Sequence, residues 1–255
     1  MFRRFAAVIL SAILLSPGWL GMTGMTLLIG FVPLLWVSAS YDDTRRSWWG
    51  MFGWATLAFA LTIWWIWYAT PVGPPAATLA STTMNMIAFM LFHTVSKKAP
   101  KALAYVTLVT AWITTEYWYT VGDFSWPWLI LGNGFSHEVW AVQWYEYTGV
   151  FGGTLWVLLS NILIFEALQA RRSTRRWAAA ACSVALPMIA SLCIWQSWEQ
   201  PDEGTARVSV IQPNVDCYDK FHGDTQRQER NIADLMAEVP AGAQFILLPE
   251  TAVPG

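Results

Sequence analysis

The feature that most constrains this chain is an alternation of long apolar stretches with short basic connections. A helix needs about 20 apolar residues to cross the hydrocarbon core of a bilayer. Seven stretches of the sequence approach that length: residues 5–19, 22–39, 49–69, 77–96, 102–121, 150–170 and 177–197. The sequence therefore predicts a polytopic α-helical membrane domain of about seven spans.

The basic residues before position 198 all fall on every second connection between these stretches. They are Arg3, Arg4, Arg45, Arg46, Lys97, Lys98, Lys101, Arg171, Arg172, Arg175 and Arg176. Cytoplasmic connections of membrane proteins carry an excess of Lys and Arg. We therefore expect a cytoplasmic N-terminus, and seven crossings then place residues 198–255 on the outer side.

The composition changes after residue 198. Residues 1–198 hold eleven Lys/Arg and seven Asp/Glu, a net charge of +4, whereas residues 199–255 hold four and ten, a net charge of −6. We expect a transmembrane domain over residues 1–198, a linker over 199–205 and a polar domain from 206. Four scattered basic residues form no stripe for phosphates, so we expect no binding of nucleic acid.

The connection over residues 121–149 is unusually long and aromatic, with four Trp, two Phe and two Tyr. Long connections in compact domains are commonly functional or disordered, and this composition is not that of a disordered segment. A lid or arm that touches lipid and a re-entrant packing element both fit the pattern. His137-Glu138 and Glu146 in this connection are candidate acid–base groups, but exposed polar residues on a loop are usually solvated, and we expect that here.

Glu116 is an acid well inside a predicted span. An acid at that depth is costly and is a functional-site hypothesis by default, although a hydrogen-bonded packing role is the alternative. Glu166 lies one turn from a basic connection and is expected to pair there. Cys182 and Cys193 lie in the last apolar stretch, where we expect small buried hydrophobic side chains.

The polar region predicts a strand, a helix and a second strand, over residues 206–212, 222–238 and 244–249. Such a unit pairs its strands in parallel through a right-handed crossover. Active sites of open α/β sheets lie beyond the carboxyl ends of the strands. Glu250 follows the second strand and is therefore a candidate catalytic residue.

These motifs together resemble the apolipoprotein N-acyltransferases of bacterial inner membranes. The run from Pro249 to Pro254 fits the family's P-E-[ST]-A-[IV]-P motif, and 211–214 resembles the end of its first extramembrane strand. Trp112 with Thr115-Glu116 resembles its W-x-x-T-E motif, and Pro127-Trp128-Leu129 its P-W-L motif. The resemblance implies a multi-pass inner-membrane domain followed by the start of a periplasmic nitrilase-like domain, an α-β-β-α sandwich.

The resemblance implies acyl transfer from a phospholipid, through a Cys thioester, to the N-terminal amine of a diacylglyceryl-cysteine apolipoprotein. Glu250 would be the general base, and Trp128, Phe221 and Glu116 would contact substrate. The family's Lys and nucleophilic Cys come after the Glu, so no residue of this chain is their counterpart. We therefore expect an N-terminal portion that is inactive alone. We also expect a monomer without metal or organic cofactor.

Two other classes of protein remain open from the sequence. A membrane-anchored nitrilase-like amidase would share Glu250 but hydrolyse C–N bonds and release its product to water. A non-enzymatic polytopic membrane protein, either a transporter or a scaffold, would use the spans alone. Glu116 is the one acid deep enough to look like a transport site, and no pair of broken spans marks a midplane pocket in the sequence.

Overall fold

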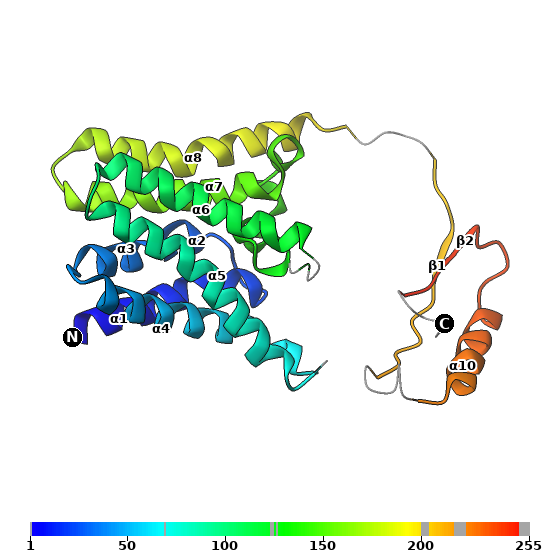
Figure 1. Cartoon of the computed structure of the whole chain (residues 1–255). Helices are drawn as coiled ribbons and strands as arrows, with labels where there is room; N and C mark the ends of the chain where they lie inside the picture. Colours follow the sequence, from blue (N-terminus) through cyan, green and yellow to red (C-terminus); the bar gives the residue numbers. More distant parts are fainter. Residues whose placement is uncertain are drawn as a thin grey trace. The chain divides into compact units, whose positions relative to one another are not determined.

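The structure is a computed structural model that describes residues 2–68, 70–122, 125, 127–199, 204–216 and 223–249. The chain divides into two units (Figure 1). The first holds residues 1–67 and 72–198, and the second holds residues 199–255 with the short segment 68–71.

The first unit is built from α-helices joined by short 3₁₀ turns. Its α-helices are α1 (Phe2–Leu15), α2 (Leu27–Gly30), α3 (Val32–Ala39), α4 (Thr44–Thr62), α5 (Gly73–Ser96), α6 (Lys101–Val121), α7 (Tyr145–Gln169) and α8 (Thr174–Ser197). Its 3₁₀ turns are η1 (Pro17–Trp19), η2 (Trp64–Tyr68), η3 (Pro127–Leu129), η4 (Leu131–Phe135) and η5 (Val139–Ala141). Neighbouring helices pack in sequence order from α4 to α8, and α1 packs against α3 and α4.

Four of the described helices are long and apolar enough to cross a membrane, fewer than the seven spans predicted. They are Phe2–Trp19, Gly73–Ser96, Tyr145–Gln169 and Thr174–Ser197. Helices α4 and α6 have 19 and 21 residues, but the Arg, Trp, Tyr and Thr residues that they contain lower their mean hydropathy. The predicted span 22–39 is a shorter apolar helix, Leu27–Ala39.

This shorter helix is broken between Gly30 and Val32, where α2 ends and α3 begins. Pro33 stands in the first turn of α3. Proline carries no N–H and is tolerated at a helix start but not in its interior. Pro33 therefore marks a helix start within residues 22–39, although the apolar composition of that stretch alone predicts one continuous span.

The core of the unit centres on a cluster of four aromatic side chains: Phe31, Trp54 of α4, Phe89 of α5 and Trp112 of α6. The Phe31 ring centroid lies 5.1 to 5.7 Å from those of the other three, with tilted, stacked and edge-on geometries. Tilted and offset ring pairs at this spacing are favourable beyond the area that they bury. The cluster joins α4, α5 and α6 to the break between α2 and α3.

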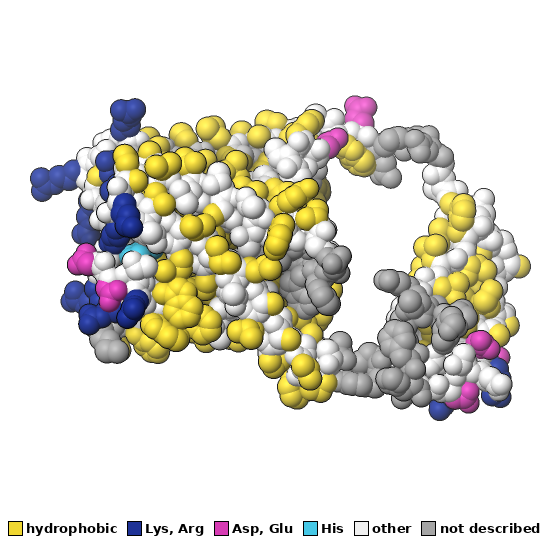
Figure 2. Space-filling view, viewed as in Figure 1, with side chains coloured by type: hydrophobic (Ala, Val, Ile, Leu, Met, Phe, Trp, Pro, Cys, Tyr) yellow, Lys and Arg dark blue, Asp and Glu magenta, His cyan; other side chains and the backbone are white. Residues whose placement is uncertain are grey.

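The basic residues gather at one end of the helical unit, as the alternation in the sequence predicts. Helices α1, α4, α6 and α8 begin beside them, and α5 and α7 end beside them. Figure 2 shows the Lys and Arg side chains at that end and hydrophobic side chains over the flanks. This is the surface pattern of helices that share one bilayer.

The second unit is a parallel β–α–β arrangement, which confirms the predicted order of elements. Strand β1 (Val208–Val210) pairs with β2 (Phe245–Leu247), and helix α10 (Thr225–Ala237) connects them. Helix α10 begins three residues later than predicted because the Asp224 carboxylate accepts hydrogen bonds from the N–H groups of Gln226 and Arg227. All three β2 side chains are exposed within the described part of the unit.

Candidate functional site

A buried carboxylate, Glu116, joins three parts of the helical unit. Glu116 lies on α6 and is 1% exposed. Its Oε1 accepts hydrogen bonds from Trp112 Nε1 (2.9 Å) and from the backbone N–H of Leu131 (2.8 Å). Its Oε2 accepts one from Thr154 Oγ1 of α7 at 2.5 Å. The carboxylate therefore ties the start of η4 to both helices.

Three donors on two oxygens satisfy most of what a buried carboxylate requires. Trp112 and Thr115-Glu116, one turn apart on α6, are the residues of the W-x-x-T-E motif. The geometry shows a reason for that spacing, because an i to i+4 separation on a helix brings the indole N–H onto the carboxylate. Of the two roles predicted for Glu116, this arrangement fits the hydrogen-bonded packing role.

The aromatic connection is packed over much of its length. Buried side chains run from Leu129 to Leu131 and recur at Phe135, Ala141 and Val142. Turn η4 packs against α7, and η5 packs against α8. The segment 129–142 is thus an integral part of the helical unit.

Glu138, predicted to be solvated, is instead 8% exposed. Its Oε2 accepts a hydrogen bond from the backbone N–H of Gly24, 114 residues earlier in the chain, at 3.0 Å. The prediction was wrong because a buried turn must satisfy its backbone donors, and a carboxylate from a distant segment does so here. No pattern local to Glu138 reveals that partner.

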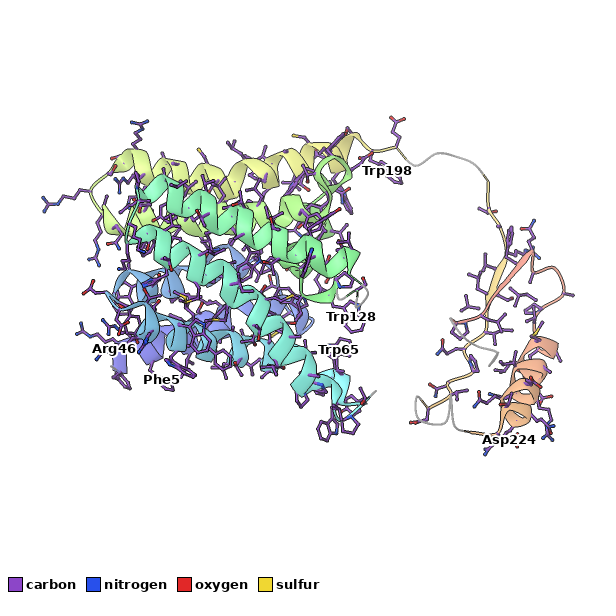
Figure 3. The ribbon with its side chains drawn as sticks, in the orientation of Figure 1. Phe5, Arg46, Trp65, Trp128, Trp198 and Asp224 are labelled. Carbon is purple, nitrogen blue, oxygen red and sulfur yellow. The ribbon has the colours of Figure 1, made fainter. Side chains whose placement is uncertain are left out.

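Trp128 lies at the surface of the unit, next to other tryptophans. Its side chain is 48% exposed. Its ring centroid lies 5.3 Å from that of Trp65 in η2, and its backbone oxygen accepts a hydrogen bond from Trp19 Nε1 at 2.7 Å. In Figure 3, Trp65 and Trp128 lie near the end of the helices opposite to Arg46. The Trp128 side chain thus contacts Trp65 and keeps an exposed face.

Two further predictions on the helical unit have opposite outcomes. Glu166 pairs with Lys101 and with Arg176, each at 3.1 Å, and accepts a hydrogen bond from Tyr105 at 2.6 Å, as a paired acid should. Cys182 and Cys193 are exposed and not buried. The reason is that α8 packs mainly on α7 and leaves most of its circumference uncovered.

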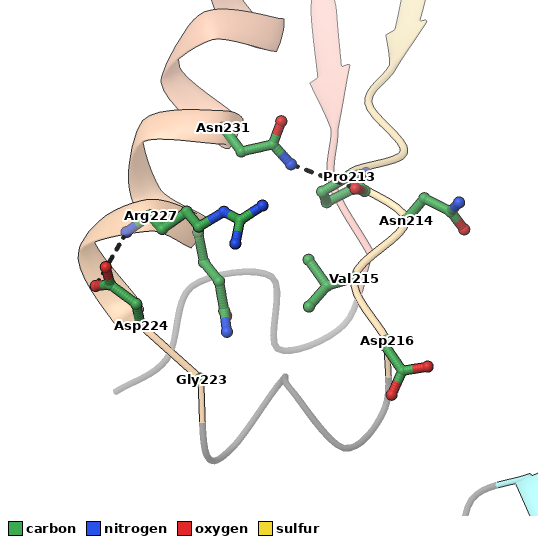
Figure 4. Close-up of a pocket in the computed structure, with 9 residues that line it drawn as sticks. Pro213, Asn214, Val215, Asp216, Gly223, Asp224, Arg227 and Asn231 are labelled. Carbon is green, nitrogen blue, oxygen red and sulfur yellow. Dashed lines mark hydrogen bonds between the residues drawn. The ribbon is translucent and has the colours of Figure 1, made fainter.

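The second unit has a hollow of about 550 Å³ between the segment after β1 and the start of α10 (Figure 4). Its described lining comprises Pro213, Asn214, Val215, Asp216, Gly223, Asp224, Arg227, Gln228 and Asn231. Asn231 Nδ2 donates a hydrogen bond to the Pro213 backbone oxygen at 3.3 Å, which holds this segment on the helix. The hollow lies at the carboxyl side of β1, the edge at which the sequence predicts chemistry.

Two residues expected at this edge, Glu250 and Phe221, lie outside the described residues, as do Cys217 and Lys220. Glu250 comes three positions after the end of β2, and β2 runs parallel to β1. Asn214 has a φ of 52°, a left-handed conformation that asparagine adopts more readily than most residues. Within the described ranges, no group of three His, Cys, Asp or Glu side chains could hold a metal ion.

The apolar helices, the single basic end and the parallel β–α–β unit together define a helical membrane protein with an appended α/β segment. A family model described as the apolipoprotein N-acyltransferase N-terminal domain matches residues 8–163. The chain belongs to this family.

Curated relatives agree with that assignment. The apolipoprotein N-acyltransferase of Chlorobaculum tepidum is 28% identical over 243 residues, which cover 89% of this chain and 44% of the relative. That of Gloeobacter violaceus is 27% identical over 252 residues, which cover 92% of this chain and 42% of the relative. The chain thus spans less than half of the length of either relative.

Proposed function

We propose that this chain serves in N-acylation of bacterial lipoproteins, as the membrane domain and the first part of the catalytic domain. The match of the family model over residues 8–163 carries the proposal. The parallel β–α–β unit supports it, since the P-E-T-A-V-P run begins two positions after the end of β2. A nitrilase-like sandwich would extend this unit with further strands and cover the exposed side chains of β2.

In the proposed reaction a Cys thiolate attacks the ester carbonyl of a phospholipid. The acyl–oxygen bond breaks, a lysophospholipid leaves, and a thioester forms. The amine of a diacylglyceryl-cysteine apolipoprotein then attacks the thioester, an amide forms, and the thiol is released. Glu250 takes the proton from the thiol and passes it to the oxygen of the departing lysophospholipid, and it then takes a proton from the amine and passes it to the departing thiolate. The Cys and the Lys that stabilises the oxyanion are assigned to no residue among positions 1–255.

The helical unit has two tasks in this proposal. It holds the enzyme in the bacterial inner membrane with the basic end in the cytoplasm, so that the α/β segment is periplasmic. It also presents the exposed face of Trp128 to the acyl chains of the substrate. Glu116 acts as a positioning residue, because it fixes the segment that follows Trp128, and Phe221 provides a further aromatic contact.

The test is lipoprotein acylation in bacterial cells depleted of their own N-acyltransferase. The native gene is expressed with and without Glu250→Gln, and the mass of the N-terminal lipopeptide is measured. We expect triacylated lipopeptide from the native sequence and diacylated lipopeptide from the variant, which keeps the shape of Glu250 but cannot accept a proton. Diacylated lipopeptide from both would refute the proposal.

The competing amidase proposal shares Glu250 but releases a free acid to water. It predicts that small amides are hydrolysed while the lipopeptide stays diacylated. The intact mass of the protein purified from its native membrane accompanies both experiments. A mass above 28.7 kDa would direct the search for the Cys and Lys to residues beyond Gly255, and a mass near it would direct the search to a second polypeptide.

A further inference from the structure

We propose that a groove between α1, α3 and α7 binds one anionic phospholipid, whose phosphate contacts Arg171. The groove lies where α7 ends and α1 begins, at the basic end of the helical unit. Trp65 and Trp128 lie near the other end (Figure 3). The site is therefore separate from the acyl-transfer chemistry proposed above.

The groove has a volume of about 410 Å³ and apolar walls. Those walls are formed by Ala7, Val32, Pro33, Trp36, Phe165 and Leu168. Trp36 is 38% exposed and Leu168 is 42% exposed, so the walls open outward. On a membrane-embedded flank this outward side meets lipid, and an acyl chain is the occupant whose chemistry matches the walls.

The polar end of the groove carries positive charge. Arg171 and Gln169 line the groove itself, and an adjoining hollow of about 680 Å³ continues over residues 168–173. Arg3 precedes Ala7 by one helical turn and therefore lies on the same face of α1. A guanidinium presents donors in a planar fork that suits phosphate oxygens. The groove thus combines an acyl-chain channel with a phosphate-binding end.

Two other arginines at the same end, Arg4 and Arg176, are already engaged by side chains of the protein. Arg4 donates hydrogen bonds to Ser40 and stacks on Tyr41, with 4.1 Å from its guanidinium carbon to the ring centroid. Arg176 pairs with Glu166. Neither Arg171 nor Arg3 makes an ion pair within the described residues.

The acids at this end do not neutralise the groove. They are Asp42, Asp43 and Glu166, and none of them lines it. Glu166 is shared between Lys101 and Arg176, and the Asp43 side chain caps α4 by accepting the Arg45 N–H. An unneutralised basic site between helices at this membrane face favours an anionic headgroup.

A second groove provides a comparison within the same molecule. It lies between α4 and α5 and has a similar volume of about 460 Å³. No charged side chain lines it: the lining residues are Trp48, Phe52, Thr83, Met86, Ile87, Met90, Leu91, Thr94 and Val95. An acyl chain would fit there with no preference for its headgroup. Headgroup selectivity in the protein should therefore arise at the α1–α3–α7 groove.

The experiment measures lipid binding to the 255-residue chain in detergent by native mass spectrometry. The probes are phosphatidylglycerol and phosphatidylcholine, each with palmitoyl and oleoyl chains, and soluble glycerophosphate as a competitor. The test variant is Arg3→Gln with Arg171→Gln, and the matched control is Lys98→Gln with Arg175→Gln, which removes two charges from the same end. Leu168→Trp fills the groove without changing the charge.

We expect the first phosphatidylglycerol to bind more tightly than phosphatidylcholine. Removal of each groove arginine should weaken the binding of phosphatidylglycerol by about fivefold. The control variant should bind phosphatidylglycerol as tightly as the wild type does. Leu168→Trp should also weaken it. Equal losses in both double variants, or equal binding of the two lipids by the wild type, would overturn the proposal. Full displacement by glycerophosphate without an effect of Leu168→Trp would show a headgroup-only site and overturn it as well.

Discussion

Glu116 of α6 and Thr154 of α7 are joined by a hydrogen bond of 2.5 Å between two buried side chains. The same carboxylate also holds Leu131, the first residue of η4. One side chain thus fixes the spacing of two helices and the path of the connection between them. Variants at this residue should therefore affect the packing of the whole aromatic connection.

Glu116→Ala should destabilise the helical unit by about 3 kcal/mol, since three buried donors lose their acceptor. In a unit of this size the Tm should fall by roughly 6–12 °C. Glu116→Gln keeps one oxygen as an acceptor and should lose less. The measurement is thermal unfolding in detergent, and an alanine variant as stable as the wild type would contradict the packing role.

Gly24→Ala should be destabilising because η4 passes directly over Gly24. A Cβ at this position would clash with the backbone oxygen of Gly134, and backbone cannot move aside as a side chain can. Overpacking of this kind typically costs about 1–3 kcal/mol. Gly53→Ala is the matched control, since nothing lies within 4 Å of its added Cβ. In helix α4 that change should be neutral or stabilise by about 0.5–1 kcal/mol.

Asn161→Leu should loosen the break between α2 and α3. Asn161 Oδ1 accepts hydrogen bonds from the N–H groups of Phe31 (2.7 Å) and Val32 (3.1 Å), and Nδ2 donates to the Leu27 oxygen (2.7 Å). We expect a loss of about 2–4 kcal/mol, because leucine leaves these buried groups without partners.

The neighbouring Ser160→Ala provides the comparison for Asn161. Ser160 is equally buried, but its hydroxyl has no hydrogen-bond partner in the described part of the chain. Its removal should change stability by less than about 0.5 kcal/mol. Hydrogen exchange of residues 27–35 is the readout, and similar exchange in both variants would argue against the role of Asn161.

Asp224→Ala should fray the start of α10. The Asp224 carboxylate accepts hydrogen bonds from the N–H groups of Gln226 at 3.0 Å and Arg227 at 3.3 Å. Loss of such a cap costs a helix about 1 kcal/mol. Amide exchange over residues 225–230 should accelerate in this variant. Glu229→Ala, an exposed change further along the same helix, should leave it unaltered.

Much of the secondary structure could be predicted from local pattern. The β–α–β order and its parallel pairing follow from strand and helix periodicities, and Pro240 marks the end of α10. The start of α10, which the Asp224 cap sets, lies three residues later than predicted. The number of membrane-crossing helices was harder to predict from the sequence. Apolar composition could not reveal that residues 22–39 form a broken, shorter helix, since the break depends on Pro33 and on the side chain of a distant helix.

The candidate site was predictable to a similar degree. Glu116 stands out in the sequence because an acid in an apolar run is costly. Of its three partners, Trp112 lies one turn away on the same helix, but Leu131 lies in η4 and Thr154 lies on α7. Glu138 and Asn161 act at a distance of more than 100 residues, and for Asn161 a lone amide within VLLSNILIF was the one local signal. Whether the exposed face of Trp128 meets substrate stays a prediction.

The sequence by itself determined the membrane class, the gathering of charge at one end and the order of elements. These properties follow from composition and from periodicities that operate within a few residues. Only the tertiary structure decided which polar groups are buried and what satisfies them. Glu116, Glu138 and Asn161 are paired through contacts between distant segments, because a buried donor or acceptor must find a partner wherever packing brings one within reach.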